Sequence, residues 1–342
     1  MPSLKTKGAG QAVLDPGPEL TIIVPVYNEA ANLPLLVERL AKVLEQHVVS
    51  WEIIGIDDGS ADNSIAVLRE LNAANPRVQA LSLSRNFGKE VAIAAGLDHA
   101  RGQAVIIMDA DLQHPPEVIP AFLEKWREGY LNVYGTRADR DGESQMKRGF
   151  ARAFYRLFSV FGETELPEGA GDFRLLDRKA VDALKALPER ARFSKGLYAW
   201  VGFRSVGVNF DVAERAHGQT SFNFRRLFRF AFDGLSSFST VPLKIATYLG
   251  VLIAVIAAFV ALFFLVRTLF FGTDLPGFPS LIVSIMFFSG IQLVSLGMIG
   301  EYVGRIFAEV KRRPLYLIGE RVGLPGAVEG DRRSDVLPPG AR

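Results

Sequence analysis

Short apolar runs alternate with amphipathic stretches between residues 20 and 108. Residues 20–26, an apolar and β-branched run, predict a buried strand, and residues 51–56, 78–83 and 104–108 predict three further strands. Between them, apolar residues at helical spacing predict helices over residues 30–44, 60–71 and 88–100, the second with Ser60 as its N-cap. This alternation predicts an α/β domain with a mostly parallel sheet and helices on both faces.

Beyond residue 117 the pattern becomes less regular, with a helix predicted over residues 118–126 and a strand over 131–134. Residues 146–161 and 223–245 mix Lys and Arg with aromatic residues at helical spacing. They are either ordinary amphipathic helices packed on the domain or helices that lie on a membrane surface. We favour the second interpretation because the segment that follows residue 245 is apolar enough to enter a bilayer.

Two long uncharged stretches, residues 246–266 and 278–300, dominate the last third of the chain. Each is long enough to cross a hydrocarbon core of about 30 Å as a helix. Neither has a polar face, which argues against a helix buried in a soluble protein. We therefore predict transmembrane helices over residues 246–271 and 278–301. Basic residues flank the pair of helices on both sides and place both chain ends in the cytoplasm: Arg225, Arg226, Arg229, Lys244, Arg305, Lys311, Arg312 and Arg313.

Composition narrows the function classes. The chain of 342 residues has a formal net charge of +2, so bulk charge gives no reason to expect nucleic-acid binding. It has no cysteine, which excludes disulfides, thiolate nucleophiles and cysteine-based zinc sites. Residues 1–18 lack the apolar core of a signal peptide and are predicted to be a disordered leader. The predicted catalytic domain then covers residues 19–222, and residues 302–342 form a cytoplasmic tail.

Acidic residues follow two of the predicted strands, with Asp57 and Asp58 after the second and Asp109 and Asp111 after the fourth. In open α/β sheets ligands bind outside the carboxyl ends of the strands. Mg²⁺ and Mn²⁺ prefer oxygen ligands, and a metal held by Asp109 and Asp111 could bridge a diphosphate and neutralise a leaving group. Alternatively, these acids cap the following helix.

Two further motifs could line a nucleotide pocket. Tyr27, in the sequence VPVYNE, could offer an aromatic face, although this segment could also be a simple turn before a helix. A carboxylate of Asp57 or Asp58, in DDGS, could accept a hydrogen bond from a base or a ribose hydroxyl. The alternative for DDGS is a helix cap with solvated acids.

The motifs VPVYNE, DDGS, SRNFGKE and DADLQHPPE, in this order, resemble the inverting family 2 glycosyltransferases of the GT-A fold. Within that family the chain is similar to polyprenyl-phosphate glycosyltransferases, such as dolichol-phosphate mannose synthases and bactoprenol glucosyltransferases. The resemblance covers residues 20–313. Two apolar helices near the C-terminus fit the bactoprenol glucosyltransferase branch best.

The resemblance implies a role for each matching residue. The residues implied to hold the nucleotide are Pro25, Tyr27, Glu29, Asp57, Asp58, Lys89 and Asp109, with Lys89 near the diphosphate. Those implied to hold a divalent cation, Mg²⁺ or Mn²⁺, are Asp109, Asp111 and Gln113. Those implied to meet the acceptor phosphate are Arg137, Arg174, Arg215 and Ser221, the last two in a motif with His217 and Gly218. Asp172 would lie next to the reacting centre, with Asp111 and Gln113, as a base or an orienting group.

The expected reaction is inverting transfer of a hexose, glucose from UDP-glucose in the first place, to polyprenyl phosphate at the cytoplasmic face of a membrane. GDP as the nucleotide and a homo-oligomeric assembly both stay open. One alternative is a processive polysaccharide synthase, but those enzymes usually carry a Q-x-x-R-W motif, and Trp51, Trp126 and Trp200 are in no such context. The other is a non-enzymatic membrane adaptor on a degenerate domain, which the retained acidic residues argue against.

Overall fold

The computed structural model describes residues 17–137, 170–187, 189, 194–211, 241–271, 277–311 and 313–324. Residues 1–16 of the predicted leader, the stretch 146–161 and most of 223–245 lie outside these residues. The strands are β1 (Leu20–Val26), β2 (Trp51–Asp57), β3 (Val78–Leu83), β4 (Ala104–Ile107), β5 (Asn132–Arg137), β6 (Ala170–Asp177), β7 (Ser205–Phe210) and β8 (Ile318–Val322). The helices are α1 (Leu33–His47), α2 (Ser64–Ala74), α3 (Lys89–His99), the 3₁₀ turn η1 (Pro116–Val118), α4 (Ile119–Arg127), α6 (Arg178–Ala186), α7 (Ser194–Trp200), α9 (Val241–Phe271) and α10 (Phe278–Val310).

The strands form one eight-stranded sheet in the order β7-β5-β6-β4-β1-β2-β3-β8. The central strands β4, β1, β2 and β3 are parallel, and antiparallel pairing begins at β4–β6 on one side and β3–β8 on the other. The chain moves outward from β1 through β2 to β3 and then crosses to β4 on the other side of β1. Such a reversal of strand order creates a ligand-binding crevice at the carboxyl ends of the strands.

Apolar side chains pack on both faces of the sheet, as the sequence predicted. On one face the strands pack against α1, α2 and α4, and on the other against α3, α6 and α7. The residues of β2 are all buried, because helices cover both of its faces. The result is the α/β domain with a mostly parallel sheet that the GT-A resemblance implies.

The helix that follows β2 starts later than the sequence predicted. α2 begins at Ser64, and the hydroxyl of Ser60 does not cap it but accepts a hydrogen bond of 3.0 Å from the backbone N–H of Asn28. The prediction of Ser60 as an N-cap is therefore wrong, because this hydroxyl joins two loops instead. α1 also begins later than predicted, at Leu33, with Pro34 in its first turn.

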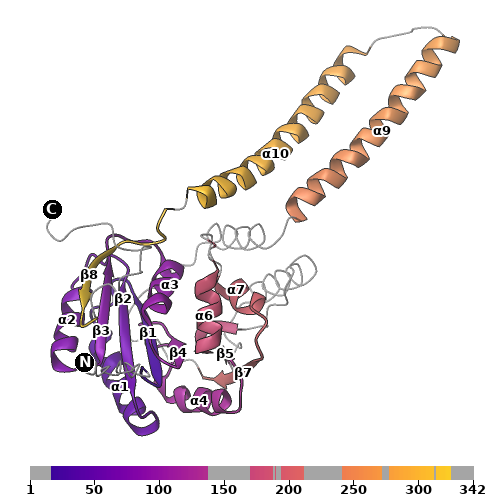
Figure 1. Cartoon of the computed structure of the whole chain (residues 1–342). Helices are drawn as coiled ribbons and strands as arrows, with labels where there is room; N and C mark the ends of the chain where they lie inside the picture. The colour runs from indigo at the N-terminus through magenta and orange to yellow at the C-terminus, as the bar shows by residue number, and fades with distance from the viewer. Residues whose placement is uncertain are drawn as a thin grey trace, which may run out of the picture.

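Two long helices, α9 and α10, extend away from the α/β domain as a pair (Figure 1). Among the described residues, one stretch, Ser284–Val310 within α10, is long and apolar enough to cross a membrane. The apolar stretch found in α9, Gly250–Val260, is shorter. Two spans were predicted, and the second, in α9, stays a prediction.

The chain does not end as a simple tail after α10. Its last described residues return to the α/β domain, where β8 pairs with β3 at the edge of the sheet (Figure 1). The sequence pattern predicted none of the elements from β6 onward except the two long helices.

Candidate active site

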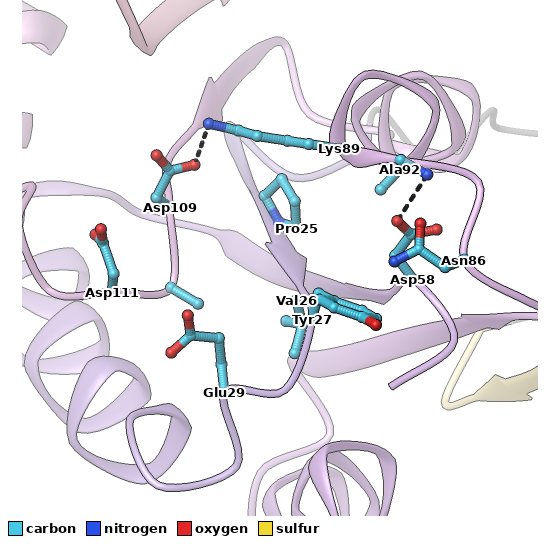
Figure 2. Close-up of a pocket in the computed structure, with 12 residues that line it drawn as sticks. Pro25, Val26, Tyr27, Glu29, Asp58, Asn86, Lys89, Ala92, Asp109 and Asp111 are labelled. Carbon is cyan, nitrogen blue, oxygen red and sulfur yellow. Dashed lines mark hydrogen bonds and ion pairs between the residues drawn. The ribbon is translucent and has the colours of Figure 1, made fainter. Parts of the chain in front are cut away.

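A pocket of about 280 Å³ opens at the carboxyl ends of β1, β2 and β4. It therefore lies at the crevice where the strand order reverses. Figure 2 shows its walls: the turn after β1 on one side, the loop after β4 on another, and the start of α3 across from both. The residues that line it are Pro25, Val26, Tyr27, Glu29, Asp58, Asn86, Gly88, Lys89, Ala92, Asp109, Ala110 and Asp111.

The turn after β1 is fixed by hydrogen bonds to the loop after β2. The backbone N–H groups of Asn28 and Glu29 each donate at 3.0 Å, to the hydroxyls of Ser60 and Ser64. Asn28 has a positive φ of 58°, and its side-chain oxygen accepts a hydrogen bond of 2.8 Å from Ala61 N–H. The turn thus holds Tyr27, whose side chain is 49% exposed, open to an incoming ligand.

Asp58 joins this loop to the turn between β3 and α3. Its carboxylate accepts hydrogen bonds from the backbone N–H groups of Phe87 (2.7 Å) and Gly88 (2.8 Å). Burial raises the pKa of Asp58, and the two N–H donors only partly offset that effect. Gly59 approaches the same turn so closely that a Cβ there would lie 2.5 Å from the backbone of Arg85.

Asp57 has a different place. Its side chain is buried, and its two oxygens accept hydrogen bonds from Ser60 N–H at 3.1 Å and the Ser82 hydroxyl at 2.7 Å. It is not among the residues that line the pocket. Asp57 therefore stabilises the loop after β2 through these hydrogen bonds, whereas Asp58 lines the pocket.

The loop after β4 presents Asp109 and Asp111 to the pocket. Between Asp111 and Gln113, Leu112 is buried with a positive φ of 61°, an uncommon conformation for leucine that the surroundings must stabilise. The backbone N–H of Gln113 donates a hydrogen bond of 3.1 Å to Asp111, but Gln113 is not among the lining residues. His114, to which the sequence assigned no function, is buried and stacks on Phe173 with ring centroids 4.9 Å apart.

The ammonium group of Lys89 crosses the pocket and pairs with two carboxylates. It lies 2.7 Å from Asp109 Oδ1 and 2.8 Å from Asp172 Oδ2 (Figure 2 shows the first pair). Burial lowers the pKa of Lys89, but these two carboxylates more than offset that and raise it overall. Burial likewise works against ionisation of Asp172, yet Lys89, with Lys195 and Arg174, lowers the pKa of Asp172 to about 2. Both groups are therefore charged at neutral pH.

The described residues hold no cluster of three or more acids or histidines that could cage a metal ion. The pocket does offer two carboxylates, Asp109 and Asp111, on one short loop. Mg²⁺ is commonly held in this way, by one or two carboxylates plus substrate phosphates. The residues thus fit a divalent cation that binds together with a phosphorylated ligand.

The structure describes two of the four residues expected at the acceptor phosphate, Arg174 and Arg137. The Arg174 guanidinium is buried, donates a hydrogen bond of 2.7 Å to the Gly171 carbonyl and lies 3.8 Å from the centroid of the Tyr198 ring. It is not among the residues that line the pocket. Arg137 ends β5. Arg215, His217, Gly218 and Ser221 lie outside the described residues.

Sequence reasoning missed several lining residues. Asn86 and Gly88 belong to SRNFGKE, from which only Lys89 was assigned, although the motif itself was the available signal. Glu90, which follows Lys89 in the same motif, accepts a hydrogen bond from the Ser194 hydroxyl. Burial raises the pKa of Glu90. No sequence signal joined Glu90 to Ser194, because the residues are far apart along the chain.

Comparisons with known proteins agree with this geometry. The sequence model of glycosyl transferase family 2 matches residues 21–185. An uncharacterized glycosyltransferase of Synechocystis sp. is 49% identical, covering 90% of this chain and 96% of the relative. The SfII prophage-derived bactoprenol glucosyl transferase of Shigella flexneri is 43% identical, covering 88% of this chain and 97% of the relative. The uncharacterized glycosyltransferase YkcC of Bacillus subtilis is 42% identical, covering 90% and 95%.

Proposed function

The chain belongs to glycosyl transferase family 2 and is a glycosyltransferase, and from this premise we propose that it transfers a hexose from a nucleotide diphosphate sugar to polyprenyl phosphate at the cytoplasmic face of a membrane. UDP-glucose is the favoured donor. The proposed nucleophile is a phosphate oxygen of the lipid, and the leaving group is the nucleoside diphosphate.

One observation carries the proposal for the donor. A pocket at the reversal of strand order is lined by an aromatic side chain, Tyr27, and, to one side of it, by the carboxylates of Asp109 and Asp111 (Figure 2). This arrangement suits a ligand with a flat base and a diphosphate, with the acids placed to hold a cation on the phosphates. The assignments of Pro25, Glu29 and Asp58 to the nucleoside follow from their place in the same lining.

The acceptor and the sugar rest on the relatives. The Shigella flexneri protein is named a bactoprenol glucosyl transferase, and this chain matches it over nearly its whole length. That likeness supports a polyprenyl phosphate acceptor and a glucosyl donor. α10, which is apolar and long enough to span a bilayer, supports a catalytic domain held next to its lipid substrate.

In the proposed reaction the bond between the anomeric carbon and the diphosphate oxygen breaks, while a bond from that carbon to the lipid phosphate forms. Attack from the opposite side inverts the anomeric centre. A phosphate monoester has a second pKa of about 6, so most of the acceptor is a dianion at pH 7. The attacking oxygen then carries no proton, and the enzyme needs to position two anionic molecules rather than deprotonate a hydroxyl.

Lys89 is placed to contribute to this positioning. Its ammonium group already pairs with both Asp109 and Asp172 at the edge of the pocket. A diphosphate bound beside Asp109 would come within reach of the same cation, which would stabilise the negative charge that grows on the leaving group. Asp172, which is ionised and paired with Lys89, would then orient the ammonium group of Lys89 rather than act as a strong base.

A divalent cation, Mg²⁺ or Mn²⁺, is part of the proposal. Asp109 and Asp111 would hold it, and Gln113 would act through its backbone hydrogen bond to Asp111. When bound, the ion would supply Lewis-acid stabilisation of the departing diphosphate. Arg137, Arg215 and Ser221 remain proposed contacts of the acceptor phosphate, and homo-oligomerisation through the long helices remains part of the proposal.

The test is transfer of radiolabelled sugar from a panel of UDP- and GDP-sugars to polyprenyl phosphate by the purified full chain with Mn²⁺ or Mg²⁺. We expect label in the organic phase from UDP-glucose, lost with EDTA and in the Asp111→Ala variant. The matched control is Asp182→Asn, an exposed aspartate of α6 outside the pocket, which should keep full activity. No transfer from any donor by folded protein would overturn the proposal, and transfer only from another sugar would correct the donor.

A further inference from the structure

The segment that follows α10, residues 315–322, returns to the α/β domain and joins the sheet. Within it β8 runs antiparallel to β3, with Val322 opposite Ala80 and Glu320 opposite Ser82 (Figure 1). β8 thereby covers the edge of β3, which would otherwise present unpaired backbone groups. This pairing places residues 318–322 against the strand that leads into the pocket.

Contacts of the segment continue past the end of β3. The backbone N–H of Ser84 donates a hydrogen bond of 2.9 Å to the Leu317 carbonyl. Ser84 is the first residue of the turn, residues 84–88, that contributes Asn86 and Gly88 to the pocket. The segment is therefore bonded directly to the chain that forms one pocket wall.

An ion pair fixes β8 to a neighbouring helix as well. Both guanidinium donors of Arg69, on α2, pair with the carboxylate of Glu320, Nε to Oε1 and Nη2 to Oε2, each at 2.6 Å. This two-point geometry specifies orientation better than a single contact does. It joins β8 to α2 in addition to β3.

Tyr316 attaches the segment to the other element that flanks the turn. Its side chain is buried, and its hydroxyl donates a hydrogen bond of 3.0 Å to Asp98 Oδ2. Its ring also packs near His99, with centroids 6.5 Å apart. Asp98 and His99 close the C-terminal end of α3, and Lys89 begins the same helix.

We propose that residues 315–322 are a positioning element of the donor pocket: they hold β3 and α3, the two elements on either side of the turn 84–88, at the spacing that the pocket requires. The inference rests on the proposed function in taking this pocket as the donor site. Displacements of about 1 Å in a substrate-positioning group are enough to change rates strongly. Because the segment begins shortly after α10 ends at Val310, it also connects that helix to the pocket wall.

The first test needs no ligand. Hydrogen exchange of the backbone amides of residues 84–90 is measured on the full chain in detergent, for Arg69→Glu, Glu320→Arg and the double variant. We expect exchange to be faster by about three- to tenfold in each single variant, and close to wild type in the double variant, which restores the pair with reversed charges. The matched control is Arg127→Glu, which breaks the exposed pair with Glu19 and should leave these amides unchanged.

A second variant is needed in case the pairing of β8 with β3 survives the loss of one ion pair. Val322→Pro removes a backbone N–H of β8 that faces Ala80, since alternate residues of β3, Ala80, Ser82 and Ser84, direct their backbone groups toward this segment, and it should weaken the pairing with β3. It should speed exchange at residues 84–90 at least as much as the charge reversals do. If neither Val322→Pro nor the charge reversals changes exchange at residues 84–90, the segment does not position the turn and the inference is wrong.

Binding of UDP with Mn²⁺, and separately of GDP, then tests the link to the donor. Single charge reversals should raise the nucleotide Kd and the donor KM about three- to tenfold, and leave the acceptor KM and the melting temperature near wild type. A purely structural role would instead lower the melting temperature and affect both substrates. If wild type binds neither nucleotide, the proposed function fails. If wild type binds and the variants bind equally well, the inference alone fails.

Discussion

The ammonium nitrogen of Lys89 lies 2.8 Å from Oδ2 of Asp172, so the first residue of α3 meets a residue of β6 across the pocket. The same ammonium group lies 2.7 Å from Asp109, in the loop after β4. Because β6 pairs antiparallel with β4, the sheet itself brings Asp172 close to Asp109. One cation therefore offsets two carboxylates that would otherwise repel each other.

Replacing this cation should damage catalysis. In a Lys89→Met variant we expect kcat/KM for the donor to fall about 10²-fold, as when an enzyme loses one group that stabilises charge in the transition state. Lys89→Arg keeps the charge and should retain part of the activity. Steady-state transfer assays measure both. Lys125→Met removes an exposed pair with Glu128 and serves as the control; a Lys89→Met enzyme within twofold of it would contradict the assigned role.

Asp172 should stabilise the fold in a way that depends on pH. Its pKa is lowered from 3.8 to about 2, so its contribution is present above about pH 4 and is lost as the pH falls through about 2. At pH 7 the shift corresponds to about 2 kcal/mol of the free energy of unfolding. We expect Asp172→Asn to be less stable than wild type by about that amount at pH 7, with the difference shrinking between pH 4 and pH 2.

Denaturant unfolding of both proteins across this pH range measures the difference. Raising the pH from 5 to 8 should leave it unchanged, because Asp172 is ionised throughout, and the pKa of its partner Lys89 is raised above its ordinary value. A stability difference that changes between pH 5 and 8 would show that Asp172 titrates there, as a general base does.

Gly59 should be replaceable only at a cost to both the fold and the pocket. It has a φ of +65°, and an added Cβ would lie 2.5 Å from the Arg85 carbonyl carbon. Gly129 also has a positive φ, +93°, but a Cβ there would meet nothing within 4 Å. Gly129→Ala thus isolates the backbone strain, and we expect Gly59→Ala to be less stable than Gly129→Ala by about 1–3 kcal/mol.

Thermal unfolding and nucleotide binding check this pair of variants. Only Gly59→Ala should weaken nucleotide binding, because it pushes the turn that carries Asn86 and Gly88. Equal melting temperatures and equal nucleotide affinities for the two variants would mean that the turn 84–88 shifts without cost to accommodate the added methyl group.

The sequence predicted the centre of the fold more closely than its edges. β1 and β3 begin and end where the predicted strands do, because strands buried on both faces read as short, largely apolar segments. The pocket acids were also predictable, since the carboxyl ends of parallel strands meet at one edge. Helix starts were less accurate, as at α2, because Ser60 bonds to a distant residue rather than to its own helix.

Other features depend on contacts that no local pattern encodes. The pairing of Lys89 with Asp172 follows from the register of β6 on β4, and β6 was not predicted. Arg174 was expected at the acceptor phosphate, but its guanidinium is buried over Tyr198. β8 falls within residues that were predicted to be a tail. Its five residues show no clear alternation between buried and exposed positions, and they are held as a strand by pairing with β3.

The proposed membrane topology can be tested because the chain has no cysteine of its own. If α9 and α10 both span the bilayer, Gly277, at the start of α10, lies across the membrane from Val49, whose side chain is 93% exposed on the α/β domain. In spheroplasts we expect a membrane-impermeant maleimide to label a Gly277→Cys variant directly and a Val49→Cys variant only after lysis. Labelling of the Gly277→Cys variant only after lysis would mean that neither helix crosses, because β8, after α10, pairs with β3, before α9, and a single span would separate these two strands. Retention of both variants in the membrane fraction after carbonate extraction is the accompanying control.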